Sequence, residues 1–207
     1  MTGFSAGPRL RNSDIARLAP GFADPVGDAQ ACFRAVLDAM AHPGRVVQIP
    51  IGLSSPLPLS PAAASIALTL CDIDTPVWLD AASTEAAPYF TFHCGGPLVA
   101  DSAEARFAFI ADPAALPSLD AFALGSDEYP ERSTTLVIAA SGFSSVPGML
   151  LSGPGIRGEL RLGVAGLPAR FWMERANLAE LFPRGLDVLF VSGSALAAVP
   201  RSTRIVL

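Results

Sequence analysis

Apolar residues first recur with helical spacing between residues 24 and 41. We predict that a helix begins near Asp24-Pro25 and that His42-Pro43-Gly44 ends it. The positions that repeat at three- and four-residue intervals are Ala29, Cys32, Phe33, Val36, Leu37 and Met40. This spacing is typical of an amphipathic helix that packs one face on a core. A strand is predicted directly after it, over residues 45–51.

The rest of the chain alternates short apolar runs with two further helices. Residues 61–71 are apolar nearly all round, which predicts a buried helix. A helix is also predicted over 169–182, and its repeating positions are Trp172, Arg175, Leu178 and Phe182. A short helical piece is expected at 113–122. Strands are predicted at 75–80, 89–93, 106–111, 133–140, 187–193 and 195–200.

These elements indicate one α/β domain with a mixed sheet flanked by helices. Residues 1–22 mix polar residues, glycine and proline without a period, so we expect a mobile N-terminal arm there. The folded domain is then expected to span residues 23–207.

The stretch Gly153-Pro-Gly-Ile-Arg-Gly158 matches the glycine spacing of dinucleotide-binding loops. Such a loop needs a strand before the glycines and a helix after them. Here Leu160, Leu162 and Val164 alternate with polar residues or glycine, which is the period of a strand. Pro154 also removes one backbone N–H that could donate to a phosphate. We therefore predict a hairpin turn and no bound NAD.

Composition excludes several classes of protein. The 14 basic residues are all arginine, so the chain has no lysine for a Walker A loop or for a pyridoxal-phosphate Schiff base. A net charge of −5 argues against a general nucleic-acid binder. No apolar run is long enough to span a membrane, and no signal peptide is evident. The odd number of cysteines, 3, is typical of reduced thiols, and we expect a cytoplasmic protein.

The charged fraction is only 16%, against roughly 25% in an average soluble domain. Such a low charged fraction favours a protein whose surface is partly covered by partners over a compact monomer.

Asp72 and Asp74 lie between two apolar segments and form the first candidate site. They could ligate a hard metal or bind a ribose. Alternatively, they shape the turn between a helix and a strand through bonds to backbone amides. No further oxygen ligands follow nearby, so the turn is the favoured reading.

The histidines and arginines supply the remaining candidates. His42 ends a helix, and His93 and Cys94 are expected to point to opposite faces at the end of a strand, so neither histidine predicts a hydrolase triad or a metal site. Arginines can bind polyphosphates where lysine is absent. The candidate anion-binding arginines are Arg157, Arg201 and Arg204.

Six stretches, in this order, resemble the H subunit family of the bacterial carbon–phosphorus lyase system, which degrades phosphonates. They are DAQACFRAVLDAMAHPG, LTLCDIDTPVWL, FHCGGPLV, TTLVIAASG, LSGPGI and FPRGLDVLFVSGSALAAVPRSTR, and together they extend over nearly the whole chain after the arm. The resemblance implies the fold of the large domain of pyridoxal-phosphate-dependent transferases, without that cofactor. It also implies a homodimer that joins the G, I and J subunits in a core complex.

With G, I and L, the family is required to transfer the ribose triphosphate of ATP to an alkylphosphonate, and the J subunit later cleaves the carbon–phosphorus bond. ATP is thus the implied substrate of the complex, and no catalytic residue is assigned to this subunit. Two hypotheses follow. In the first, the chain is a structural, dimer-forming subunit. In the second, it contributes directly to a nucleotide, ribose-phosphate or phosphonate site through its arginines or the Asp72/Asp74 turn.

Overall fold

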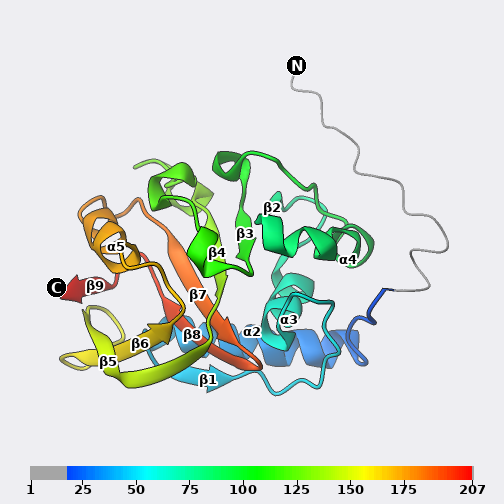
Figure 1. The fold of residues 1–207 in the computed structure, drawn as a ribbon, viewed down its shortest axis with the longest axis horizontal. Coiled ribbons are helices and arrows are strands. Elements are labelled where there is room, and N and C mark those ends of the chain that lie inside the picture. The colour runs from blue at the N-terminus through cyan, green and yellow to red at the C-terminus, as the bar shows by residue number, and fades with distance from the viewer. Residues whose placement is uncertain (1–17, 207) are drawn as a thin grey trace.

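The computed structural model describes residues 18–206, which form a central sheet covered on both faces (Figure 1). Its six strands lie in the order β1-β8-β7-β4-β3-β2. They are β1 (Val46–Gln48), β2 (Val77–Leu79), β3 (Phe107–Ile110), β4 (Thr135–Ala139), β7 (Asp187–Ser192) and β8 (Ala195–Val199). Neighbours from β2 through β7 are parallel, whereas β8 is antiparallel to both β7 and β1. The predicted mixed sheet is confirmed.

One face of the sheet is covered by α2 (Pro25–Ala41), α3 (Pro61–Leu70) and α4 (Ala87–His93). Asp24 caps α2 by accepting from the Gly27 amide at 3.1 Å, and Ser60 caps α3 from the Ala63 amide at 3.2 Å. The N-terminal half of α3 is buried, as its apolar sequence predicts.

The buried stripe of α2 consists of Cys32, Val36 and Ala39. Phe33 and Leu37, which belong to the predicted apolar face, are 47% and 52% exposed. The apolar face of α2 is therefore wider than the contact that the sheet and α3 provide. Ahead of the helix, Leu18, Ala19 and Phe22 pack against the same core, so the packed domain extends beyond the expected boundary at residue 23. The remainder of the predicted arm, residues 1–17, lies outside the described residues.

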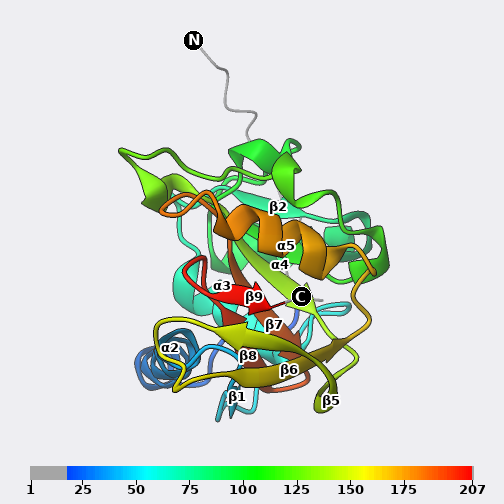
Figure 2. The same cartoon turned by 90° about the vertical axis from the view of Figure 1, so that its left-hand side faces the viewer.

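The opposite face is covered by α5 (Phe171–Ala179) and a small second sheet. That sheet has the order β6-β5-β9, with β5 (Gly142–Ser152), β6 (Leu160–Ala165) and β9 (Arg204–Val206). Figure 2 shows α5, β9 and the β5–β6 hairpin on this side of the molecule. Short 3-10 turns complete the described chain: Ala81–Ala86, Ser102–Glu104, Pro113–Ala115, Leu119–Ala121 and Pro130–Arg132.

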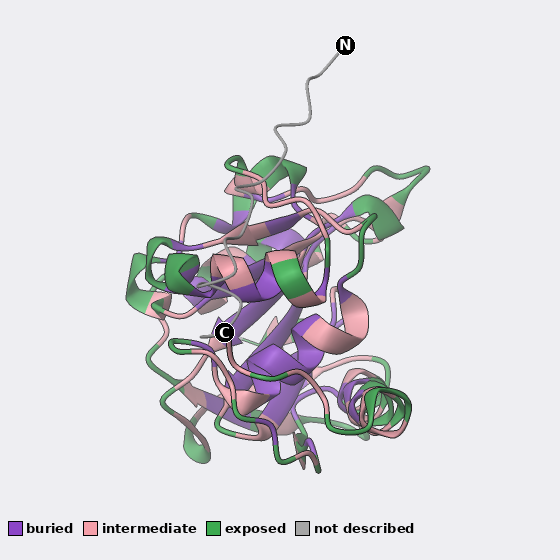
Figure 3. Cartoon of the chain, turned by 90° about the vertical axis from the view of Figure 1, so that its right-hand side faces the viewer, coloured by how far each residue is buried: buried purple, intermediate pink, exposed green. Residues whose placement is uncertain are grey.

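Alternation along the central strands divides the apolar residues between two cores. Phe109 and Val137 face the α2–α3–α4 side, while Ala108 and Leu136 face the α5 side. The strands at the centre are buried (Figure 3). A strand buried on both faces shows a continuous apolar run, and for this reason the sequence of residues 133–140 predicts a strand. The two cores therefore lie on opposite faces of one sheet.

Three sequence predictions need correction. Residues 89–93 form the end of α4 and not a strand: Tyr89 and Phe90 are adjacent and both buried, which one face of a helix allows as well as a strand covered on both faces. The helical piece at 113–122 is two 3-10 turns. The third correction is that α5 ends at Ala179, so that Phe182 is 61% exposed instead of extending the buried face.

The glycine-rich stretch is a hairpin turn, as predicted, because β5 pairs antiparallel with β6 on either side of it. Gly155 has φ +82°, and a Cβ there would lie 2.2 Å from the carbonyl oxygen of Ala41. The turn therefore packs directly on the end of α2, at a distance that only glycine permits.

No helix between residues 18 and 206 is both long and apolar enough to cross a bilayer.

Candidate functional site

The carboxyl edge of the parallel strands is where open α/β sheets usually hold ligands, and in this protein it is closed. Pro58, Leu59 and Ser60 cover the ends of β3, β4 and β7. The cavity left there measures about 10 Å³, which holds about one water molecule. The amide of Ala62 also donates to the carbonyl of Gly193 at 3.0 Å, which joins the start of α3 to the end of β7. This hollow is therefore too small to hold a substrate.

The Asp72/Asp74 turn has the structural form that the sequence favoured. Asp72 Oδ1 accepts from the Asp74 amide at 3.0 Å and from the Thr75 hydroxyl at 2.7 Å. These bonds lower the pKa of Asp72, with the Thr75 hydroxyl as the larger cause. Both aspartates are exposed. Between residues 18 and 206, three or more His, Cys, Asp or Glu side chains nowhere gather as a metal site.

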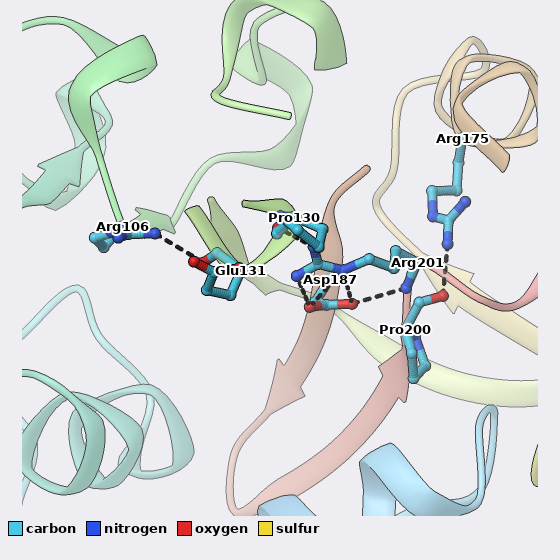
Figure 4. Close-up of polar contacts among 7 residues, drawn as sticks. All are labelled: Arg106, Pro130, Glu131, Arg175, Asp187, Pro200 and Arg201. Atoms are coloured by element: carbon cyan, nitrogen blue, oxygen red, sulfur yellow. Dashed lines mark hydrogen bonds and ion pairs between the residues drawn. The ribbon is translucent and has the colours of Figure 1, made fainter. Parts of the chain in front are cut away.

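Arg201 is engaged within the protein. Its Nη2 lies 2.5 Å from Asp187 Oδ2, its Nε donates to the same oxygen at 3.1 Å, and its backbone amide donates to Asp187 Oδ1 at 2.7 Å (Figure 4). The Nη1 group donates to the carbonyl of Pro130. The bidentate pair links the start of β7 to the segment that follows β8.

Arg175 is a second cation beside this pair, and the sequence reasoning did not select it. It lies on α5 with 1% exposure, and its Nη2 donates to the carbonyl of Pro200 at 2.6 Å. Its Nε has no partner among the described residues. Burial lowers the pKa of Arg175 to about 10, Asp187 opposes that shift and the charge of Arg201 adds to it. The sequence did contain a signal for this residue, because the helical repeat places Arg175 on the buried face of its helix.

Arg204 and Arg201 line an open pocket of about 400 Å³ between β9, the β5–β6 hairpin and the end of α5. We call it the β9 pocket. Its other lining residues include Ser152, Gly153, Phe182 and Ser202. Arg204 is exposed and stands opposite Ser152 in the ladder between β5 and β9. Arg201 and Arg204, which are close in the sequence, therefore line the same pocket.

Arg157 lies apart from them, on the other side of the hairpin turn. It lines a separate open hollow of about 270 Å³ with His42, Arg45 and Glu159. Asp38 lies 3.0 Å from His42 Nδ1 and 3.7 Å from an Arg45 Nη1 group. This hollow therefore contains both acidic and basic groups, and the structure does not unite the three candidate arginines in one site.

His93 and the three cysteines occupy structural positions. His93 Nε2 lies 3.1 Å from the carbonyl of Ala19, at the end of α4 and not of a strand. All three cysteines are buried. Burial raises the pKa of Cys32 and Cys71 above the ordinary thiol value and that of Cys94 to about 12. These thiols are therefore protonated at neutral pH and are poor nucleophiles.

Together, the fold and these sites define an α/β protein whose usual ligand edge is closed and whose exposed arginines lie elsewhere. Residues 20–206 match the model of the PhnH family, described as a bacterial phosphonate metabolism protein. The chain belongs to this family, and the resemblance found in its sequence is confirmed.

Two relatives add detail. The chain is 41% identical, over 186 residues, to the alpha-D-ribose 1-methylphosphonate 5-triphosphate synthase subunit PhnH of Rhizobium meliloti, covering 89% of this chain and 93% of that protein. It is 34% identical, over 177 residues, to the putative C-P lyase subunit protein HtxG of Stutzerimonas stutzeri, covering 85% of each chain.

Proposed function

We propose that this chain is a non-catalytic subunit of a carbon–phosphorus lyase core complex. In that complex it forms a homodimer, positions the G and I subunits and also joins the J subunit. In this role it supports, with G, I and L, the transfer of ribose 5-triphosphate from ATP to an alkylphosphonate. The names of both relatives describe a subunit, and one of them names the ribose 1-methylphosphonate 5-triphosphate synthase. The protein is expected to act in the cytoplasm.

The closed carboxyl edge of the sheet is the observation that best supports a role in assembly. An enzyme of this architecture would need space at the ends of β3, β4 and β7, where about 10 Å³ remains. A fold like that of pyridoxal-phosphate transferases, also expected from the resemblance, would lack its chemistry here because the chain has no lysine.

Exposed apolar side chains agree with contacts to partners. Val26, Phe33 and Leu37 on α2 are 69%, 47% and 52% exposed, and Val46 on the adjoining edge strand is 42% exposed. Large apolar groups gathered on a charge-poor surface are typical of protein interfaces.

Coexpression of this chain with the G, I and J subunits tests the proposal. We expect a single complex on size-exclusion chromatography that contains every subunit, and we expect the synthase reaction to require this chain when L and ATP are added. The isolated chain should sediment as a dimer and turn over neither ATP nor an alkylphosphonate. A monodisperse, fully active complex that forms without the chain contradicts the assembly role, and turnover by the chain alone contradicts its non-catalytic character.

A further inference from the structure

We propose that the β9 pocket binds the phosphate group of an organic phosphate ester, with Arg204 as the principal ligand. This site does not depend on the assembly role, because a subunit that only supports its partners can still hold a phosphorylated ligand. Its chemistry follows from the lining residues, the charge behind them and the size of the opening.

Four of the lining residues have polar side chains that can donate hydrogen bonds: Arg201, Arg204, Ser152 and Ser202. No carboxylate is present in the lining that the structure describes. A phosphate has several oxygens that can accept from such donors at once, and pairs with arginine are among the stronger hydrogen bonds in proteins.

Arg204 is placed to make the direct contact. It is exposed on β9, and within residues 18–206 it forms neither an ion pair nor a side-chain hydrogen bond. Arg201, in contrast, is held by Asp187 and Pro130 and forms a fixed wall of the pocket. One arginine is therefore available, and the other is preorganised beside it.

Arg175 and Arg201 place two positive charges beside the β9 pocket. The carboxylate of Asp187 pairs with Arg201 and also acts on the charge of Arg175. The charge of Arg201 disfavours the charged form of Arg175, which is direct repulsion between two cations. Arg204 adds a third positive charge at the pocket lining, and an anion bound there would offset these charges.

The dimensions favour an ester over a free inorganic ion. A volume of about 400 Å³ lies within the usual range of small-molecule sites and far exceeds what one phosphate requires. Phe182 also lines the pocket and is 61% exposed, so its ring can pack against the organic part of the ligand.

Isothermal titration of the full-length chain with AMP and with inorganic phosphate tests the site. We expect AMP to bind with a Kd below about 1 mM and inorganic phosphate about tenfold more weakly, because only AMP contacts Phe182. Arg204→Gln should weaken both ligands at least about tenfold, the loss of one charged hydrogen bond. Phe182→Ala should weaken AMP alone.

Arg34→Gln is the matched control, because it removes the same charge from an exposed position on α2, which packs on the opposite face of the sheet. We expect it to change either affinity by less than about twofold. Absence of AMP binding at about 10 mM, or equal weakening by Arg204→Gln and Arg34→Gln, would overturn the site. Equal affinities for AMP and inorganic phosphate would overturn the assignment of an ester. Since none of these titrations involves a partner subunit, their failure is distinct from failure of the coexpression experiment.

Discussion

Arg201 and Asp187 form a bidentate ion pair in which Asp187 also accepts the backbone amide of Arg201 at 2.7 Å. Their side chains are only 17% and 15% exposed. The pair joins the beginning of β7 to the turn that leads into β9, and it therefore holds one wall of the β9 pocket in position.

Asp187→Asn should destabilise the protein by about 2–4 kcal/mol, because it leaves Arg201 and the neighbouring Arg175 without their carboxylate. Urea denaturation measures this loss. Asp74→Asn is the control at an exposed turn and should change the free energy of unfolding by less than about 0.5 kcal/mol. Equal effects of the two substitutions would show that the ion pair contributes no net stability.

Arg175→Met should change the free energy of unfolding by less than about 1 kcal/mol, because an apolar side chain of similar length removes a buried charge and still fills its space. Arg175→Ala should cost about 2–4 kcal/mol, since it leaves a cavity under α5. Chemical denaturation of the two variants separates charge from packing. A methionine variant as unstable as the alanine variant would mean that the bond to Pro200 stabilises the protein more than the burial of the cation destabilises it.

Gly155→Ala and Gly158→Ala test the close approach of the hairpin turn to α2. Both glycines have positive φ, +82° and +76°, so both substitutions incur the backbone strain of about 1–2 kcal/mol. Only at Gly155 would the added Cβ also meet backbone, 2.2 Å from the Ala41 oxygen; at Gly158 it meets nothing within 4 Å. We expect Gly155→Ala to be the more destabilising by at least about 2 kcal/mol in thermal or urea unfolding. Equal losses would refute the contact.

The buried thiols should make stability fall in alkaline solution. Burial raises the pKa of Cys94 to about 12, whereas an unfolded thiol titrates near about 8.5. The unfolded chain therefore loses its proton first, so the stabilising contribution is complete below about pH 8.5 and declines as pH rises toward 12. Cys94→Ala should reduce this slope between pH 8 and 10, by at most about 1.4 kcal/mol per pH unit. An unchanged slope, or rapid reaction of the folded protein with a thiol reagent at pH 8, would contradict burial.

Local pattern was sufficient where one segment determines its own structure. The 3.6-residue repeat predicted α2, the continuous apolar run predicted β4, and the alternation after Gly158 separated a hairpin from a nucleotide loop. It failed at residues 89–93, where both helix and strand can bury Tyr89 and Phe90 in a short apolar run.

The sequence alone determined the α/β class, the absence of lysine, the two close arginines at positions 201 and 204, and the family resemblance. Only the tertiary structure decided which groups remain available. Asp187 engages Arg201, Arg175 is buried behind it, and β9 pairs with β5 to bring Arg204 beside Ser152. These contacts join residues that are distant in the chain, and no local periodicity encodes them, because they depend on how the second sheet packs on the first.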